Sequence, residues 1–213
     1  MKTLAHSQNI SPLVIKRLPR YYRFLEELLA EDITRISSAE LAKRMGLTAS
    51  QIRQDLNCFG GFGQQGYGYS VIELKDSISE ILGLKKYEKA ILIGAGNLGR
   101  AVSLHVNFER FGFKLIGVFD KKESSVGQII KDVPVRHILG LENFCRDNKP
   151  TTAILCIPKE EAKKVTEELI SFGIKGFWNF THYDIAVNHK DVVVENVHLS
   201  DSLMALRYHI KGL

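Results

Sequence analysis

The stretch that decides the fold of this chain is Ile91-Leu92-Ile93-Gly94-Ala95-Gly96-Asn97-Leu98-Gly99. A short apolar run leads directly into glycines with the spacing G-x-G-x-x-G, and a helix-prone stretch follows them. Asp120 closes a second apolar run about twenty residues beyond Gly99, which is the spacing that a βαβ unit requires. The glycine pattern alone is weak evidence, but in this context it indicates a unit that binds a dinucleotide.

Each glycine of this loop has a separate physical reason. Gly94 permits the tight turn after the strand, Gly96 lets the backbone approach a pyrophosphate, and Gly99 lets the helix lie close to the sheet. Free N–H groups at the start of the helix, together with the helix dipole, favour a bound anion. We therefore expect a cofactor-binding loop that consists of Gly94, Ala95, Gly96, Asn97, Leu98 and Gly99.

Asp120 sets the kind of dinucleotide that we expect. Its carboxylate would accept hydrogen bonds from the adenosine ribose, and its charge would repel a 2′-phosphate, which favours NAD(H) over NADP(H). Lys121 and Lys122 follow it and argue in the other direction. A glycine turn that binds nothing, or that binds another nucleotide such as coenzyme A, is the alternative.

Two later segments also end predicted strands. Ile157-Pro158 follows the third main strand, and Asn179-Phe180 follows the fourth. Ligands of open parallel sheets bind at the carboxyl ends of the strands. We therefore expect Ile157, Pro158 and Asn179 on the nicotinamide side of the site.

The composition is that of an ordinary globular protein. The chain has 213 residues, of which 45% are hydrophobic and 25% are charged, enough for one large or two small domains. No apolar run approaches the length of a membrane span, and residues 1–11 lack the apolar core of a signal peptide, so we expect a cytosolic chain. The three cysteines are widely spaced and form no zinc set, so we expect them to be reduced.

The net charge permits nucleic-acid binding without indicating where it occurs. The formal charge is +5 and the isoelectric point is about 9.0. Residues 1–80 hold 10 Lys and Arg against 9 Asp and Glu, and residues 81–213 hold 19 against 15, so the excess is spread along the chain. Any prediction of DNA binding must therefore rest on pattern.

The segment before the glycine loop predicts a helix-turn-helix. Apolar residues at helical spacing predict a helix over 11–30, where Pro19 should break or kink its start. The capping box Ser37-Ser38-Ala39-Glu40 opens a second helix through about Met45, and Gly46 supplies a turn. Thr48-Ala49-Ser50-Gln51 then opens a third helix through about Phe59, which completes the motif.

Residues 60–69 predict a wing. They hold five glycines and three aromatic residues, which favour tight turns and strands, so we interpret them as a β-hairpin. A low-complexity linker is the alternative. A helix from about Ile72 to Leu84 then leads into the second domain.

From Lys89 onward the pattern alternates between strand and helix. Strands are expected at 89–93, 114–119, 152–157, 176–180 and 192–197, and helices near 98–111, 138–147 and 159–172. This predicts a doubly wound parallel sheet of the Rossmann type, followed by an amphipathic helix from Leu199 to Ile210. The fold class is α/β, with a winged-helix domain at 1–84, a Rossmann domain at 85–198 and a C-terminal helix at 199–213.

The third predicted helix carries the candidate DNA-reading residues. The N-terminal residues of a recognition helix reach base edges, where Arg suits guanine and Gln suits adenine. Lys43 and Arg44 end the preceding helix and suit phosphate contacts. The wing would reach a minor groove or the backbone. The candidates are Lys43, Arg44, Ser50, Gln51, Arg53, Gln54, Tyr67 and Gly68. The alternative is a solvated polar face on a protein-interaction module.

A dehydrogenase is the rival function. Hydride transfer needs a proton donor or acceptor beside the nicotinamide and a place for the substrate. The chain has no Tyr-x-x-x-Lys pair, and only about 125 residues follow the start of the sheet, too few for a separate substrate domain. His105 and His198 lie on elements that border the expected cofactor, but no histidine has an obvious acidic partner in sequence. We therefore predict no catalysis.

The whole chain from about residue 11 to 210 resembles the Rex family of bacterial redox-sensing transcriptional repressors. The resemblance rests on six stretches. They are Lys16-Arg17-Leu18-Pro19-Arg20-Tyr21-Tyr22-Arg23, Ala49-Ser50-Gln51-Ile52-Arg53-Gln54-Asp55-Leu56, the glycine-rich run 59–69, Gly94-Ala95-Gly96-Asn97-Leu98-Gly99, Gly173-Ile174-Lys175-Gly176 and Val194-Glu195-Asn196-Val197.

The resemblance implies a homodimer that exchanges the helix at 199–210, binds operator DNA when NADH is scarce and releases it when NADH rises. It also implies that Arg53 reads the operator and that Arg23 lies at an interface of the two domains. The sequence departs from the family pattern where His198 replaces an acidic residue and His105 replaces a tyrosine. Leu199 and residues near Phe180 are expected to line an apolar pocket that favours NADH, because NADH lacks the positive charge of the NAD⁺ ring.

Overall fold

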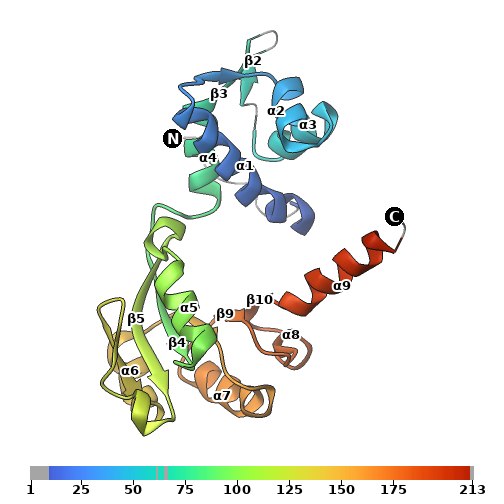
Figure 1. Cartoon of the computed structure of the whole chain (residues 1–213). Coiled ribbons are helices and arrows are strands. Elements are labelled where there is room, and N and C mark those ends of the chain that lie inside the picture. The colour runs from blue at the N-terminus through green and yellow to red at the C-terminus, as the bar shows by residue number, and fades with distance from the viewer. Residues whose placement is uncertain (1–9, 61, 65–66, 212–213) are drawn as a thin grey trace. The chain divides into compact units, whose positions relative to one another are not determined.

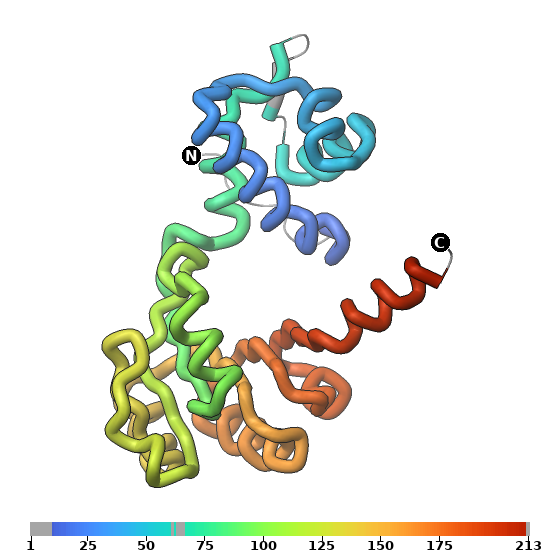
Figure 2. Tube along the Cα trace, in the orientation of Figure 1, coloured from blue at the N-terminus to red at the C-terminus, as the bar shows by residue number. Residues whose placement is uncertain are grey.

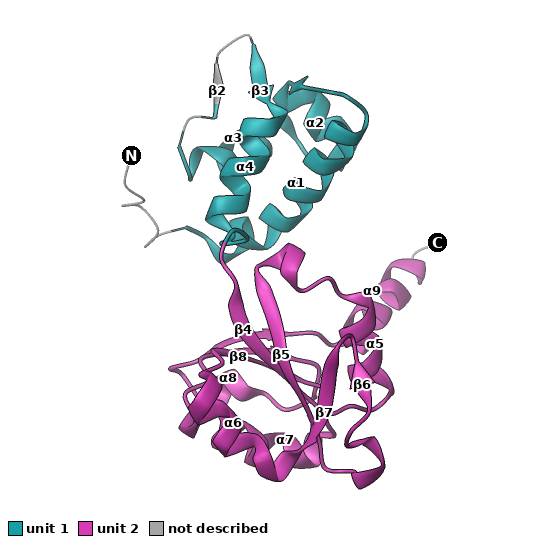
Figure 3. Cartoon of the chain, turned by 90° about the vertical axis from the view of Figure 1, so that its left-hand side faces the viewer, with its two compact units in different colours: residues 1–85 teal, residues 86–213 magenta. Residues whose placement is uncertain are grey.

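The computed structural model describes residues 10–60, 62–64 and 67–211, which form two compact units. Unit 1 comprises Met1–Lys85 and unit 2 comprises Lys86–Leu213, coloured separately in Figure 3. Each unit has its own hydrophobic core.

Unit 1 begins with helix α1 (Pro12–Ala30), which is capped by the Ser11 side chain. The expected break at Pro19 does not occur, because the helix continues through it. Proline removes one backbone donor, but Leu18 and Tyr21 beside it are fully buried, and their packing holds the helix together. Helix α1 packs against α4 (Val71–Ile81) across the core of the unit.

The predicted helix-turn-helix is confirmed as α2 (Ser38–Met45) and α3 (Ala49–Asn57). The Ser37 hydroxyl accepts a hydrogen bond from the Glu40 N–H, and the Thr48 hydroxyl accepts one from the Gln51 N–H. Gly46 adopts the left-handed conformation with φ +62°, which ends α2. Helix α3 ends at Asn57, two residues before its predicted end near Phe59.

The wing is a small antiparallel sheet of order β1-β3-β2, built from β1 (Arg35–Ile36), β2 (Gly63–Gln64) and β3 (Gly68–Ser70). The pairing of β2 with β3 agrees with the expected hairpin, whereas β1 was not predicted from the sequence. Residues 61 and 65–66 of the expected hairpin lie outside the described residues. Gly68 has φ +72°, and a Cβ there would lie 2.6 Å from the Ile36 carbonyl oxygen, so only glycine fits.

Unit 2 is built around a seven-stranded sheet of order β10-β9-β8-β4-β5-β7-β6. All neighbouring strands pair in parallel except β6, which is antiparallel to β7. The parallel strands follow the doubly wound order 3-2-1-4-5-6. The bounds are β4 (Glu88–Ile93), β5 (Phe113–Asp120), β6 (Ile129–Ile130), β7 (Val133–His137), β8 (Thr152–Leu155), β9 (Gly176–Asn179) and β10 (Val193–Asn196).

Helices cover both faces of this sheet, as Figure 1 shows. Side chains of α5 pack with one core cluster, and side chains of α6 and α7 pack with the other. The bounds are α5 (Asn97–His105), α6 (Leu141–Asn148), α7 (Lys159–Ser171) and α8 (Ile185–Asn188). The predicted end of the helix at 98–111 is wrong. Helix α5 ends at His105 because the backbone of Val106 is extended, and a separate 3₁₀ turn, Glu109–Phe111, follows.

Helix α9 (Leu199–Ile210) extends from the end of β10 without packing on the rest of unit 2, as the trace in Figure 2 shows. None of its residues is buried, although it carries six large apolar side chains. These are Leu199, Leu203, Met204, Leu206, Tyr208 and Ile210. An apolar face of this size on one helix indicates a missing partner. Within the described ranges, no helix is both long enough and apolar enough to cross a bilayer.

Candidate functional site

The glycine loop joins β4 to α5, and two of its glycines are required by close packing. Gly94 has φ +99°, and a Cβ there would lie 2.4 Å from the Cys156 carbonyl oxygen. A Cβ on Gly99 would lie 1.8 Å from the Gly94 carbonyl oxygen. These contacts explain the turn and the close approach of α5 that the sequence predicts.

Gly96 is different, because the fold does not require it to be glycine. Its φ is −71°, and in the part of the chain that the structure describes no atom outside its chain neighbours lies within 4 Å of where a Cβ would be built. The space beside Gly96 is therefore open, at the N-terminus of α5. No side chain caps this helix start, and its first turn holds no acidic residue. Its backbone N–H groups can therefore bind an anion.

The Asp120 carboxylate is fixed beside the loop. One of its oxygens accepts the Ala95 N–H at 2.7 Å, and the other accepts the Lys122 N–H at 2.8 Å. Each carboxylate oxygen has a second acceptor site, so the group can still accept hydrogen bonds from ribose hydroxyls. The Arg100 guanidinium stabilises the same loop by donating a hydrogen bond to the Ala95 carbonyl oxygen.

A cavity of about 880 Å³ opens at the carboxyl ends of β4, β5 and β8. This is the point at which the strand order reverses, where open α/β sheets bind their ligands. The predicted residues Gly94, Gly96, Asp120, Ile157 and Pro158 line it. The other predicted loop residues, Ala95, Asn97, Leu98 and Gly99, surround the N-terminus of α5. The volume is large enough for a nucleotide ligand.

Asn179 does not line this cavity. It is fully buried, and its amide nitrogen donates to the Tyr183 carbonyl and the Asn196 side chain. Its amide oxygen accepts from the backbone and hydroxyl of Thr181. All of these contacts lie within the chain, so Asn179 holds the turn after β9, and its predicted cofactor contact stays a prediction.

His198 lies at the start of α9 and has an acidic neighbour that sequence reasoning missed. Its Nδ1 lies 3.3 Å from an Asp201 carboxylate oxygen, and its Nε2 lies 3.0 Å from the Thr181 carbonyl oxygen. Its ring also stacks on His182 at 5.1 Å between centroids. The signal in the sequence was the three-residue spacing from His198 to Asp201.

The three other predicted switch residues are exposed on separate elements. His105 ends α5, Leu199 begins α9, and Arg23 lies on α1. The predicted roles of these residues and of His198 stay predictions.

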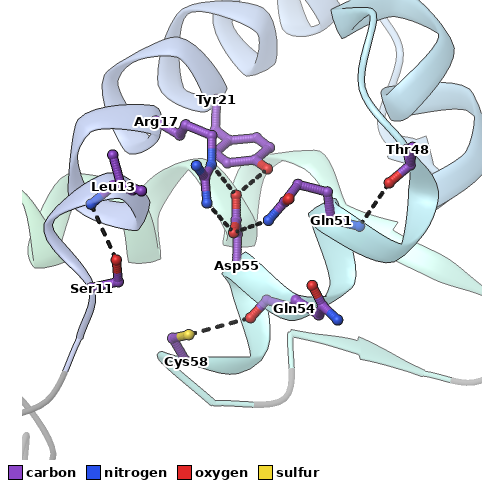
Figure 4. Close-up of polar contacts among 9 residues, drawn as sticks. All are labelled: Ser11, Leu13, Arg17, Tyr21, Thr48, Gln51, Gln54, Asp55 and Cys58. Carbon is purple, nitrogen blue, oxygen red and sulfur yellow. Dashed lines mark hydrogen bonds and ion pairs between the residues drawn. The ribbon is translucent and has the colours of Figure 1, made fainter.

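In unit 1, a buried polar network connects α3 to α1, shown in Figure 4. The Asp55 carboxylate is 1% exposed and accepts two hydrogen bonds from the Arg17 guanidinium, at 2.6 and 2.7 Å. It also accepts the Tyr21 hydroxyl and the Gln51 amide, each at 2.8 Å. Sequence reasoning missed this network, although an acidic residue on the apolar side of α3 was its signal.

The network sets the ionisation of its members. Burial alone would raise the pKa of Asp55, but hydrogen bonds from Arg17, Tyr21 and Gln51 outweigh it and hold the pKa below its usual value. Burial, together with the hydrogen bond to Asp55, raises the pKa of Tyr21. Asp55 is therefore a stable carboxylate that ties the two helices together.

The predicted DNA-reading residues differ in how the structure holds them. Ser50, Arg53 and Gln54 are exposed on α3, and Arg53 donates to the Ser38 hydroxyl at 3.1 Å. The Gln51 side chain instead points toward the buried Asp55 carboxylate, to which its amide donates (Figure 4). The structure thus separates an outward set on α3 from an inward one.

The candidate phosphate contacts also differ. Lys43 is exposed, whereas Arg44 forms ion pairs with Glu31 at 2.7 Å and with Glu40 at 3.6 Å. Tyr67 is exposed at the end of the wing, next to Gly68. Arg35 of β1, which was not predicted, is exposed and donates to the Tyr67 carbonyl, so it adds a cation to the wing.

Known proteins resemble this chain over both units. The family model described as "Putative DNA-binding protein N-terminus" matches residues 9–57, and the "CoA binding domain" model matches residues 85–183. A redox-sensing transcriptional repressor Rex from Caldicellulosiruptor saccharolyticus is 51% identical, covering 95% of this chain and 92% of that protein. One from Thermoanaerobacter pseudethanolicus is 52% identical, covering 97% and 92%.

Solved structures agree. RSP in complex with β-NAD⁺ and operator DNA matches with a TM-score of 0.90 and 51% identity, over 97% of this chain and 94% of that one. RSP in complex with β-NADH matches with a TM-score of 0.88 and 48% identity, over 97% and 96%.

A winged helix-turn-helix joined to a Rossmann-type nucleotide unit defines a transcriptional regulator that responds to a nucleotide. Within this class, about half of the residues are identical to those of named Rex repressors over nearly the whole chain. The chain belongs to the Rex family of redox-sensing transcriptional repressors, as its motifs indicate, and its relatives are regulators rather than enzymes.

Proposed function

We propose that this chain binds two-fold symmetric operator DNA as a homodimer and releases it when NADH binds in unit 2. The observation that carries the proposal is that one chain holds both an outward-facing recognition helix and a cavity at the switch point of a Rossmann sheet. The RSP structures, with operator DNA and with NADH, support the pairing of these ligands. A DNA repressor that follows the NADH/NAD⁺ ratio acts in the cytoplasm, where we place it.

The two ligands must be linked through two arrangements of the dimer. NADH binds the arrangement that is incompetent for DNA more tightly than the competent one, and operator DNA then weakens NADH binding by the same factor. NADH lacks the positive charge of the NAD⁺ ring, so an apolar wall disfavours NAD⁺. We propose that Leu199 and the region of Phe180 would form such a wall.

Dimer formation rests on α9. We propose that this helix, with the segment 199–213, is exchanged between subunits, which would cover its apolar side chains. Helix-turn-helix proteins commonly bind as dimers to paired half-sites, so exchange would couple the two recognition helices.

The test is a gel-shift titration of operator DNA with NADH and, separately, with NAD⁺. NADH should release the DNA at lower concentration than NAD⁺. Equal effects of the two nucleotides, or no effect of either, would contradict the proposal.

Coenzyme A binding is the second candidate, because the family model that matches unit 2 carries that description. Asp120 distinguishes the two ligands, since its carboxylate would accept hydrogen bonds from ribose hydroxyls that bear no phosphate. Calorimetric titration with NADH and with coenzyme A compares them directly. An Asp120→Ala variant should lose NADH affinity, and retained affinity would argue against the ribose contact.

A further inference from the structure

An ion pair spans the nucleotide cavity. Lys121 follows the last residue of β5, and Glu161 lies in the first turn of α7, so the two come from opposite sides of the switch point. The Lys121 Nζ lies 2.6 Å from a Glu161 carboxylate oxygen, and both residues line the cavity. Their side chains are 61% and 32% exposed, so the pair lies at the surface of the cavity, within reach of a ligand.

This pair changes the electrostatic interpretation of the cavity. Counted from the sequence, Lys121 and Lys122 stand against Asp120 and favour a ligand with an additional phosphate. In the structure, Lys121 is neutralised by Glu161, and a second lining lysine, Lys164, lies 3.9 Å from the Glu168 carboxylate.

The charges of the whole lining also disfavour a ligand with an additional phosphate. Among the described residues, five carboxylates and three lysines line the cavity, which gives these side chains a formal charge of −2. The carboxylates are Asp120, Glu142, Glu160, Glu161 and Glu168, and the lysines are Lys121, Lys122 and Lys164. The cavity therefore disfavours additional negative charge on its ligand.

We propose that Glu161 is a specificity residue that excludes 2′-phosphorylated dinucleotides by holding Lys121. This inference rests on the proposed binding of NADH. A phosphate monoester carries about −1.5 to −2 charge near neutral pH. Beside Asp120 it needs a free cation, as the arginine provides in NADP-binding Rossmann folds. Here Lys121, which directly follows Asp120, is already paired, and displacing Glu161 would leave a second carboxylate facing the phosphate. Lys122 also lines the cavity, so the exclusion that we assign to Glu161 acts through Lys121 alone.

The experiment compares the ratio of NADPH to NADH affinity, measured by calorimetry on the full-length protein. Glu161→Gln keeps the size of the side chain and releases Lys121, so the ratio should shift towards NADPH by about five-fold, the size expected for one accessible ion pair. The shift should shrink at high salt, because exposed charges are screened. Adding Lys121→Gln to Glu161→Gln should remove the gain.

Glu160→Gln is the matched control, because it removes the same charge from the same helical turn and leaves the Lys121 pair intact. Its effect on the ratio should be clearly smaller. The inference would be overturned if Glu161→Gln left the affinity ratio unchanged, or if Glu160→Gln changed it equally. In either case, NADH binding by the unmodified chain would still support the proposed function. Failure of the unmodified chain to bind NADH would overturn both.

Discussion

At the scale of single residues, Asp55 decides what Gln51 does. Gln51 occupies a helix position that usually reaches base edges, but its amide donates to a buried carboxylate. The same carboxylate binds Arg17 and Tyr21 on α1. We therefore infer that Gln51 positions α3, and we expect the outward Arg53 and Gln54 to contact bases.

Operator scanning separates these roles. We expect Gln51→Ala to weaken binding to the operator and to its single-base variants by one common factor. Arg53→Ala should instead lose about 1–3 kcal/mol of discrimination at one base pair. Gln54→Ala is the matched control of the same residue type on the exposed side of α3. Loss of preference at a single base pair in Gln51→Ala would show that Gln51 reads bases.

The lowered pKa of Asp55 predicts how the stability of unit 1 depends on pH. A carboxyl with a lower pKa in the folded state stabilises the fold fully above its unfolded pKa of about 3.9. That contribution is lost as the pH falls through the folded value, which is lower still. Thermal unfolding from pH 6 to pH 2 should therefore show a decline that begins below about pH 4.

The control for that decline is Asp55→Asn, which cannot ionise. It should unfold more easily at pH 7, by about 2–3 kcal/mol, because it leaves the partly buried Arg17 guanidinium without its carboxylate. Its stability should also depend less on pH in the acid range. An identical acid decline in both proteins would mean that other carboxyls cause it.

At the scale of elements, the turn between β4 and α5 contains one glycine that the fold requires, Gly99, and one that we expect only ligand binding to require, Gly96. Gly99→Ala would place a methyl group against the Gly94 carbonyl and should destabilise the protein by about 2 kcal/mol or more. Gly96→Ala has an allowed backbone and open space, so its stability should change by less than about 1 kcal/mol. Its methyl group would nevertheless occupy the expected pyrophosphate position, and NADH affinity should fall about tenfold.

Calorimetry with NADH and thermal unfolding of both variants check this prediction. Normal NADH affinity in Gly96→Ala would contradict a pyrophosphate at this position. Normal stability in Gly99→Ala would contradict the close contact.

These elements also show which parts of the fold could be predicted. Helices α2 and α3 and the loop at 94–99 are specified by neighbouring residues: a hydroxyl cap, a left-handed glycine, a strand followed by glycines. Strand β6, at the edge of the sheet, and its neighbour β7 carry little signal, because β6 has two residues and β7 contains Pro134.

The polar contacts within the candidate sites were harder to predict. The bond from Arg17 to Asp55 joins residues 38 positions apart, and the bond from Asn179 to Asn196 joins residues 17 apart. Such pairs depend on how elements pack, which no local pattern encodes. For this reason the sequence indicates the residue types of the site but does not distinguish a ligand contact from a structural one.

At the scale of the whole molecule, we expect the stability of the proposed dimer to depend on the apolar face of α9. Leu203 is 67% exposed in one chain and lies on the apolar face of the helix. Leu203→Glu should yield monomers in light scattering and weaken operator binding by about a hundredfold or more, because each subunit then binds a half-site alone. Leu203→Met keeps the apolar surface and should remain dimeric. A dimeric Leu203→Glu protein would contradict the exchange of α9.

The buried network around Asp55 divides α3 into two classes of position for protein engineering. Inward positions belong to a network that α1 and α3 share, so we expect a library that varies Gln51 to yield mostly proteins with weakened DNA binding. The outward side chains of Ser50, Arg53 and Gln54 lie on the same helix but do not bind Asp55, although Arg53 donates to the Ser38 hydroxyl on α2. New operator preferences should therefore be sought by randomising these three codons alone, with the response to the nucleotide left untouched.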